Sequence, residues 1–314
     1  MKDLLRTQDL SRPDIELLLE TAADFATNPM RSSTALANKS VAIYMTKPST
    51  RTRLSSETAV AHLGGTPIFI RGDELQLGRG ESIADTAKII SSYCSALIIR
   101  TFAQADVNEL GANASIPVIN ALTDDDHPTQ LLADWLTIRE HFGKDITGRK
   151  FVYLGDGNNM SNAWLIMGAI MGAHVVAATP TGLWSPDPDV VAIAQKIAMQ
   201  SGGKIEVLHD PEAAAKDASV LYTDVWMSMG DSESERDEKV LALSPFAVTE
   251  NLMSLTQKDS VFMHCLPAHR GEEVEASVID GTKSLIWREA FHRRTTIQSL
   301  LYHLVRDDLK GSSQ

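Results

Sequence analysis

The sequence predicts an α/β protein with two domains, each a mostly parallel sheet flanked by helices. Short apolar segments rich in β-branched residues alternate along the chain with longer patterns of helical spacing, which is typical of parallel sheets covered by helices. The length of 314 residues suits two hydrophobic cores better than one. We place the junction at residues 143–148, a segment that begins and ends with glycine.

The first half contains four expected strands, each followed by a turn or a helix. Ser11 and Ser82 are suited to cap two of the helices, because a serine hydroxyl accepts a hydrogen bond from the free N–H groups of a first turn. Another helix, residues 52–63, stops at two glycines, and a further one begins after His127. The strands are expected at residues 41–45, 67–70, 96–99 and 117–119.

The second half continues the alternation of strand and helix without repeating the sequence of the first. A strand, the tight turn at residues 155–159 and a helix ended by Gly172 open it, and a helix over residues 289–305 closes it. Its strands are expected at residues 151–154, 174–178, 205–208, 220–222 and 261–265.

Composition and charge exclude several classes of protein. A net charge of −12 argues against binding a phosphate polymer through bulk electrostatics. No apolar run approaches the ~18 residues that span a bilayer, and the N-terminus lacks the apolar core of a signal peptide. We therefore expect a cytoplasmic protein with no membrane or nucleic-acid partner. The two cysteines, Cys94 and Cys265, do not make a disulfide framework.

The stretch from Lys47 to Arg53 is the strongest candidate for a binding site. It joins an expected strand to an expected helix, and Ser49 or Thr50 can serve as the N-cap. The free N–H groups and positive end of the helix dipole favour an anion there, and arginine adds a planar fork that matches phosphate oxygens. A capped helix with surface arginines would have the same sequence. Arg53, four residues before Glu57, is as suited to a structural ion pair as to a ligand.

Two further polar stretches follow expected strands. Arg100 ends the third strand, and His127 to Gln130 come after the fourth, at the start of a helix. In sheets of this kind, ligands bind beyond the carboxyl ends of the strands. Three separate stretches therefore predict one site for a small anion.

The turn at residues 155–159 resembles part of a dinucleotide-binding fingerprint. Met160 stands where the third glycine belongs, and the next strand ends without an acidic residue. The turn therefore argues against a nicotinamide cofactor. Asn159 either presents its amide to a polar ligand or only tolerates the turn conformation.

Asp224 and Cys265 both lie near the ends of expected strands. Asp224 either holds an ammonium group or belongs to an ordinary acidic surface loop. Cys265 either acts as hydrogen-bond partner or base in a cleft, or is a buried inert thiol. His264 precedes it, but neighbours on a strand point to opposite faces, so we expect no metal at this pair.

These motifs resemble the ornithine branch of the aspartate/ornithine carbamoyltransferase family, over nearly the whole chain and in the family's order. The family motifs S-T-R-T-R, Q-L-G, H-P-x-Q, G-D-G-N-N, D-x-W-x-S-M-G and H-C-L-P are matched by Ser49–Arg53, Gln76–Gly78, His127–Gln130, Gly155–Asn159, Asp224–Gly230 and His264–Pro267.

The resemblance implies both the fold and the reaction. The first domain of the family binds carbamoyl phosphate, the second binds the amino acid, and the final helix packs back on the first domain. We assign these parts to residues 1–143, 144–290 and 291–314. The resemblance further implies a homotrimer, or a multiple of one, with sites near subunit interfaces. The expected reaction moves the carbamoyl group to the δ-amino group of L-ornithine, giving L-citrulline and phosphate for arginine biosynthesis, without metal or organic cofactor.

The resemblance also assigns residues to roles. The expected catalytic residues are Cys265 as proton acceptor or orienter, Asp224 as the group that positions the δ-amine, and Arg100 and His127 as donors to the oxyanion. The residues expected to contact carbamoyl phosphate are Ser49, Thr50, Arg51, Thr52, Gln76, Arg100, His127, Gln130, Cys265, Leu266 and Arg293. Those expected to contact ornithine are Asn159, Asp224, Ser228 and Met229.

Other functions stay open at this point. Thr129 stands where ornithine enzymes often have cysteine and aspartate enzymes often have threonine, so putrescine, N-acetylornithine and aspartate remain alternative acceptors. Residues 228–230 and Cys265 favour ornithine. The broken glycine fingerprint disfavours an NAD-dependent oxidoreductase, and the presence of the signature residues disfavours a non-catalytic binding protein.

Overall fold

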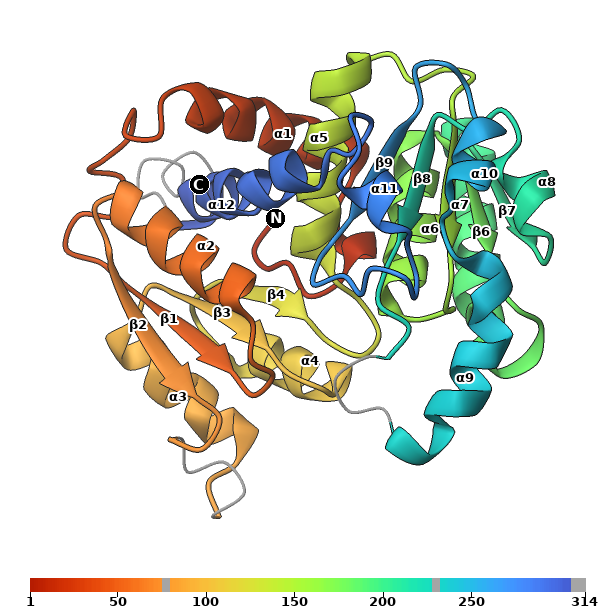
Figure 1. The fold of residues 1–314 in the computed structure, drawn as a ribbon. Coiled ribbons are helices and arrows are strands. Elements are labelled where there is room, and N and C mark those ends of the chain that lie inside the picture. The colour runs from red at the N-terminus through yellow and green to blue at the C-terminus, as the bar shows by residue number, and fades with distance from the viewer. Residues whose placement is uncertain (75–79, 228–231, 306–314) are drawn as a thin grey trace. The chain divides into compact units, whose positions relative to one another are not determined.

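The computed structural model describes residues 1–74, 80–227 and 232–305. The chain forms two compact units, one of residues 1–136 with the chain from residue 291 onward, the other of residues 137–290. Each unit contains one parallel sheet flanked by helices (Figure 1), which confirms the predicted α/β class. Within the described ranges, no helix combines the length and the apolar character needed to cross a membrane.

The sheet of the first unit has four parallel strands in the order β2-β1-β3-β4. β1 and β3 are central and buried on both faces, which explains their continuous apolar runs. The chain order reverses between them, so the segments that follow β1 and β3 flank the switch point where such sheets bind ligands. The strands are β1 Ser40–Met45, β2 Thr66–Arg71, β3 Ala96–Arg100 and β4 Val118–Leu122.

Helices cover both faces of this sheet (Figure 1). α3 and α4 pack on one face, against alternate residues of β1 and β3, and α1, α2 and α12 lie on the other. Ser11 and Ser82 cap α1 and α3 as predicted. Apart from α12, the helical segments are η1 Thr7–Asp9, α1 Arg12–Thr27, α2 Thr50–His62, α3 Ile83–Tyr93, α4 Gln104–Asn113 and α5 Pro128–Phe142, of which α5 ends in the second unit.

The last helix, α12 (Ile286–Val305), starts in the second unit and returns to the first, as predicted. Ser299 Oγ donates a hydrogen bond to the Leu18 carbonyl at 2.8 Å, and the Tyr302 ring meets Phe25 edge-on with centroids 5.6 Å apart. The buried apolar face of α12 thereby completes the core of the first unit.

The sheet of the second unit has five parallel strands in the order β7-β6-β5-β8-β9. The chain order reverses between β5 and β8, so the turn after β5 and the segment after β8 flank its switch point. The strands are β5 Lys150–Leu154, β6 His174–Ala178, β7 Lys204–Leu208, β8 Val220–Thr223 and β9 Val261–His264.

The helices of the second unit differ greatly in length and burial. α6 is buried along most of its length, whereas α7, of similar length, is largely exposed, and the other helices are short. They are α6 Asn159–Met171, η2 Gly182–Trp184, α7 Pro188–Ser201, α8 Pro211–Ala215, η3 Glu233–Glu235, α9 Arg236–Leu243, η4 Ser244–Phe246, α10 Glu250–Ser254 and α11 Ala276–Ile279.

Candidate functional site

The turn between β1 and α2 has the geometry of an anion site. Ser49 is the N-cap, and its Oγ accepts a hydrogen bond from Thr52 N at 3.2 Å. The N–H groups of a first helical turn have no partner within the helix, and the helix dipole adds partial positive charge. Thr52 is buried, whereas Ser49 and Arg51 are half-buried. The polar groups of the turn therefore lie at the edge of the core.

His127, directly before α5, lies among three arginines of the first unit. Burial lowers the pKa of its ring well below the ordinary value, and the charges of Arg293, Arg100 and Arg51 lower it further. The imidazole is therefore neutral at pH 7 and can donate a hydrogen bond while the arginines supply positive charge. The arginines come from α12, the end of β3 and the start of α2, so four distant segments meet here.

Arg293 connects the buried polar residues of this cluster. Its guanidinium donates to Gln130 Oε1 and lies 3.4 Å from His127 Nε2. It also lies 3.5 Å from the hydroxyl of Thr52 and 3.5 Å from that of Thr129. We call Thr52, His127, Gln130 and Arg293 the His127 cluster. Sequence pattern alone offered no reason to include Arg293, which entered through the family resemblance.

Two cations of the stretch 47–53 are engaged outside the His127 cluster. Lys47 forms an ion pair with Asp124. Arg53 Nε donates to Glu57 Oε1 at 3.1 Å, and the guanidinium lies over the Phe69 ring, 3.8 Å from its centroid. Arg53 therefore forms a structural ion pair with Glu57 and stacks on Phe69. Arg51 is the arginine of the turn whose charge acts on His127.

Asp126 ties the start of α5 to the N-terminal segment. Its carboxylate accepts hydrogen bonds from Thr7 N at 2.6 Å, Thr7 Oγ1 at 2.7 Å and His127 N at 2.7 Å. Burial nevertheless raises the pKa of this carboxyl to about 6. Asp126 therefore fixes the backbone that carries His127, and its burial makes the fold sensitive to pH.

Replacing Asp126 with asparagine is expected to change how stability depends on pH. The folded pKa of about 6 exceeds the unfolded value of 3.8, so the folded state binds the proton first. The contribution of Asp126 to the free energy of unfolding therefore falls, by about 3 kcal/mol in all, as the pH rises through this window. Urea unfolding of both proteins at about pH 4.5 and about pH 7.5 should show the variant gaining relative to wild type at the higher pH. A difference in the free energy of unfolding between the two proteins that does not change with pH would contradict the raised pKa of Asp126.

In the second unit, the turn between β5 and α6 is shaped by its glycines and by Asn158. Gly155 has a φ of +131°, and a Cβ on Gly157 would lie 2.2 Å from the backbone of a neighbouring loop. Asn158 caps α6, because its Oδ1 accepts from backbone N–H groups of the first turn. Asn159 is the first residue of α6 and is half-buried.

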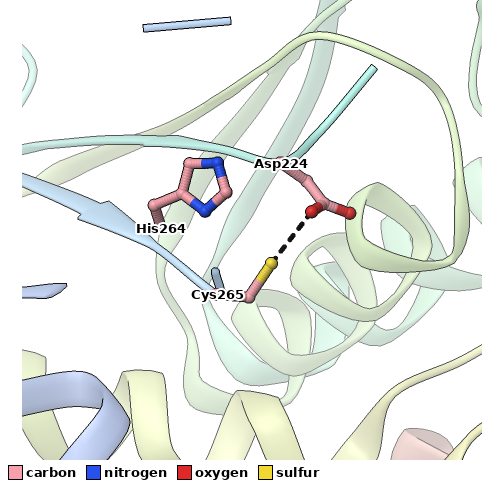
Figure 2. Close-up of side chains that lie close together, drawn as sticks. All are labelled: Asp224, His264 and Cys265. Carbon is pink, nitrogen blue, oxygen red and sulfur yellow. Dashed lines mark hydrogen bonds between the residues drawn. The ribbon is translucent and has the colours of Figure 1, made fainter. Parts of the chain in front are cut away.

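Asp224, just past β8, is held by three donors. Its Oδ1 accepts from Val225 N at 2.8 Å and from Cys265 Sγ at 3.0 Å (Figure 2). Its Oδ2 accepts from Asn158 Nδ2 at 3.2 Å. A carboxylate oxygen can accept more than one hydrogen bond, so Oδ2 can still receive an ammonium group. Cys265 Sγ and Asp224 Oδ1 are therefore in direct hydrogen-bond contact, so a proton can pass between the two groups.

The expectation that strand alternation separates His264 from Cys265 is wrong. β9 ends at His264, so Cys265 lies beyond the strand and alternation does not apply to the pair. One ligand atom from each of Asp224, His264 and Cys265 lies within 4.8 Å of the others (Figure 2). These atom types suit zinc. In the structure, however, Cys265 Sγ forms a hydrogen bond with the Asp224 carboxylate, and His264 Nδ1 accepts a hydrogen bond from Leu266 N.

His264 and Glu273 shape the site, although the sequence analysis gave neither a role. His264 Nδ1 accepts a hydrogen bond from Leu266 N at 2.8 Å, and His264 Nε2 lies 3.3 Å from Glu273 Oε1. Leu266 has a φ of +59°, a left-handed conformation that is strained for leucine. The hydrogen bond to His264 therefore fixes the Leu266 backbone, and with it the direction of the Leu266 carbonyl. Nine positions separate the pair, and no local spacing pattern marks such a contact.

Three expected site residues, Gln76, Ser228 and Met229, lie outside the described residues. The remaining expected residues fall into two groups. The first unit contributes the anion turn, Arg100 and the His127 cluster, and the second contributes Asn159, Leu266 and the Asp224–Cys265 pair. Each group lies beyond the carboxyl ends of its own sheet, at the switch point.

Asn158 links the turn to Asp224, and two variants separate its two roles. Asn158→Asp keeps an oxygen to cap α6 but cannot donate to Asp224 and places a second carboxylate beside it. Turnover should fall roughly tenfold or more, because the lost bond is to a charged acceptor and a second negative charge takes its place, while the cap of α6 is kept. Asn158→Ala should lower both turnover and melting temperature. Thermal unfolding and steady-state rates check this, and an Asp variant with wild-type turnover would refute the link.

Comparison with known proteins also divides the chain in two close to residue 140. The family model for the aspartate/ornithine carbamoyltransferase carbamoyl-P binding domain matches residues 2–140. The model for the Asp/Orn binding domain of the same family matches residues 147–304. Between them the two models cover almost the entire chain.

Individual relatives give the same result over nearly their full length. The chain is 48% identical to an ornithine carbamoyltransferase of Pyrococcus horikoshii over 93% of this chain and 92% of that protein. It is 47% identical, at the same coverage, to the anabolic ornithine carbamoyltransferase of Pyrococcus furiosus. Among solved structures, the ornithine carbamoyltransferase from Pyrococcus furiosus matches with a TM-score of 0.92 and 45% identity over 97% of both chains.

Proposed function

Because this chain belongs to the aspartate/ornithine carbamoyltransferase family, we propose that it transfers the carbamoyl group of carbamoyl phosphate to the δ-amino group of L-ornithine. The products are L-citrulline and phosphate. The observation that carries the proposal is the convergence of Arg51, Arg100 and Arg293 on a neutral, buried His127. Such a cluster offers fixed positive charge and a hydrogen-bond donor to a small phosphorylated carbonyl compound.

The first unit binds and activates carbamoyl phosphate. The hydroxyls of Ser49 and Thr50, the N–H groups of the first turn of α2 and the Arg51 guanidinium hold the phosphate, with Gln76 as a further ligand. The carbonyl oxygen becomes an oxyanion when the carbon is attacked. Donors that face this oxygen lower the barrier, and the candidates here are Thr52, Arg100 and His127. Arg293 adds positive charge beside the same carbon.

The amino group of carbamoyl phosphate needs acceptors. Gln130 Oε1 and the carbonyl of Leu266 fill this role. The conformation of Leu266, held by His264 and Glu273, is the means by which the second unit presents that carbonyl. Removal of water from around this group prevents hydrolysis of the activated carbamoyl.

The second unit binds the acceptor and manages its protons. An alkyl ammonium has a pKa of ~10.4 and must lose one proton before its nitrogen attacks the carbonyl carbon. Asp224 binds the ammonium, and Asp224 and Cys265 together provide the path for that proton. A second proton leaves the nitrogen after the C–N bond forms and can pass to the phosphate as the C–O bond breaks.

A cationic acceptor fits this half of the site better than aspartate does. The carboxylate of Asp224 attracts an ammonium group and would repel the side chain of aspartate. Thr129 does not contradict this choice, because its side chain is buried and its hydroxyl donates to the Ala121 carbonyl at 3.4 Å. Asn159, Ser228 and Met229 hold the α-amino and carboxylate groups of ornithine, which putrescine lacks.

The cellular context is part of the same proposal. One relative is named anabolic and another, at lower identity, catabolic; the higher identity to the anabolic one supports a role in arginine biosynthesis. We propose a cytoplasmic location, which the two free cysteines support, because reducing compartments keep cysteines as thiols. A homotrimer, or a multiple of one, follows from the family resemblance.

The proposal is tested by following both products of one reaction. With carbamoyl phosphate and ornithine, the enzyme should form citrulline and phosphate in equal amounts. Without ornithine, phosphate release should stay at the spontaneous rate. Phosphate release that still exceeds citrulline after the spontaneous rate is subtracted would show that the chain transfers the carbamoyl group to water instead.

A further inference from the structure

Gln130 and Asp134 lie one turn apart on α5, and both side chains are buried. Gln130 Nε2 donates to Asp134 Oδ1 at 2.8 Å, while Gln130 Oε1 accepts from the Arg293 guanidinium. The two ends of a side-chain amide are often hard to tell apart, but here the partners decide. A guanidinium has only donors, so the oxygen must face Arg293 and the NH₂ must face Asp134.

We infer that Asp134 is a positioning residue that makes the enzyme prefer a carbamoyl phosphate to an acyl phosphate. It does so by accepting a hydrogen bond from Gln130 Nε2 and so keeping Gln130 Oε1 turned toward Arg293. The inference rests on the proposed function and deepens it, because it names the residue that orients Gln130, the acceptor for the NH₂ of the substrate.

The chemistry of the two ligands explains the preference. Carbamoyl phosphate and acetyl phosphate have nearly the same shape, but one carries NH₂ where the other carries CH₃. A carbonyl oxygen accepts two hydrogen bonds, so Gln130 Oε1 can bind Arg293 and the carbamoyl NH₂ together. A methyl group makes no such bond. Without an acceptor for Nε2, the amide is free to move away from this orientation.

Two substitutions at one position separate this role from a purely structural one. Asp134→Leu has the same number and branching of side-chain heavy atoms and no acceptor. Asp134→Asn loses the charge but keeps an oxygen that can accept from Gln130 Nε2. A role in positioning Gln130 predicts that only the leucine variant loses the preference, whereas a role of the negative charge predicts that both variants lose it.

The experiment measures the KM for carbamoyl phosphate and the inhibition constants of acetyl phosphate and inorganic phosphate, with ornithine saturating. The ratio of the acetyl phosphate inhibition constant to the carbamoyl phosphate KM reports the preference. In Asp134→Leu this ratio should fall roughly tenfold, the effect of one hydrogen bond, while the constant for inorganic phosphate stays near wild type. Asp134→Asn should keep most of the wild-type ratio.

Three outcomes would overturn the inference. The first is a wild-type ratio in Asp134→Leu, and the second is an equal fall of the ratio in the leucine and asparagine variants. The third is a ratio that falls further in the double variant Gln130→Met/Asp134→Leu than in Gln130→Met alone. If Asp134→Leu does not fold, Asp134→Ala makes the same comparison. Failure of the proposed function itself would appear separately, as a wild-type enzyme without turnover of carbamoyl phosphate.

Discussion

Replacing Arg51 with alanine is expected to lower kcat/KM for carbamoyl phosphate by at least ~10²–10³-fold, because a fixed positive charge opposite the leaving phosphate is lost. The Arg51→Ala variant should still fold, since the Arg51 side chain is half-buried at the start of a helix whose cap is Ser49. Arg51→Lys should recover only part of the loss, because an ammonium lacks the planar fork that grips two phosphate oxygens. Steady-state rates and thermal unfolding provide the check.

Arg53 offers a matched control on the same helix. Its guanidinium pairs with Glu57 and stacks on Phe69. Arg53→Ala should therefore change kcat/KM by only a small factor while removing the same formal charge. Equal losses in the Arg51 and Arg53 variants would mean that general electrostatics, and not the contact made by Arg51, produces the effect.

Replacing Asp224 with asparagine should lower kcat by ~10²–10⁴-fold, the range for losing a positioned proton acceptor. The KM for ornithine should also rise, because the carboxylate that attracts the ammonium is gone. Inhibition by inorganic phosphate should stay near wild type, since the phosphate-binding turn belongs to the other unit. The three constants come from one set of initial-rate measurements, and an unchanged kcat would remove Asp224 from the proton step.

Two changes at Cys265 show whether sulfur itself carries the proton. Cys265→Ser keeps a donor to Asp224, whereas Cys265→Ala leaves that carboxylate oxygen without its partner. If the thiol only orients Asp224, serine should rescue most of the turnover that alanine loses. If sulfur accepts the proton, serine should fail as well and the pH dependence of kcat should move. A pH profile and rate unchanged in both variants would exclude Cys265 from the step.

The alternation of apolar strands and helices was enough to predict the fold class. Each central strand is buried on both faces and therefore reads as one continuous apolar run, as in Val41–Met45. α4 and α9 were not predicted because their mixed polar composition shows no clear apolar stripe. α7 was not predicted either, although Asp187, Pro188 and Gly202 are recognisable start and stop residues.

Strand ends were the most informative signals for the site. Because the carboxyl ends of parallel strands meet at one edge, Arg100 and His127 were placed near the turn before α2 without any knowledge of contacts. Residues that act through long-range contacts carried no such signal. Asn158, Glu273 and Asp134 position other side chains, and only the folded chain reveals which partners they hold.

Local rules failed where an element ended earlier than expected. The expected strand ran through Cys265, but β9 stops at His264, and the argument about opposite faces failed with it. A boundary error of one residue was enough to reverse the geometric conclusion, since side-chain direction in a strand changes with every residue.

One competition experiment tests the proposed function most directly. The enzyme receives carbamoyl phosphate labelled with ¹³C at its carbonyl, together with an equimolar mixture of ornithine, putrescine, N-acetylornithine and aspartate. NMR spectroscopy then identifies each labelled ureido product. We predict that the label appears in citrulline, with an equal amount of phosphate released. Label found mainly in another ureido compound, or phosphate released without one, would contradict the account.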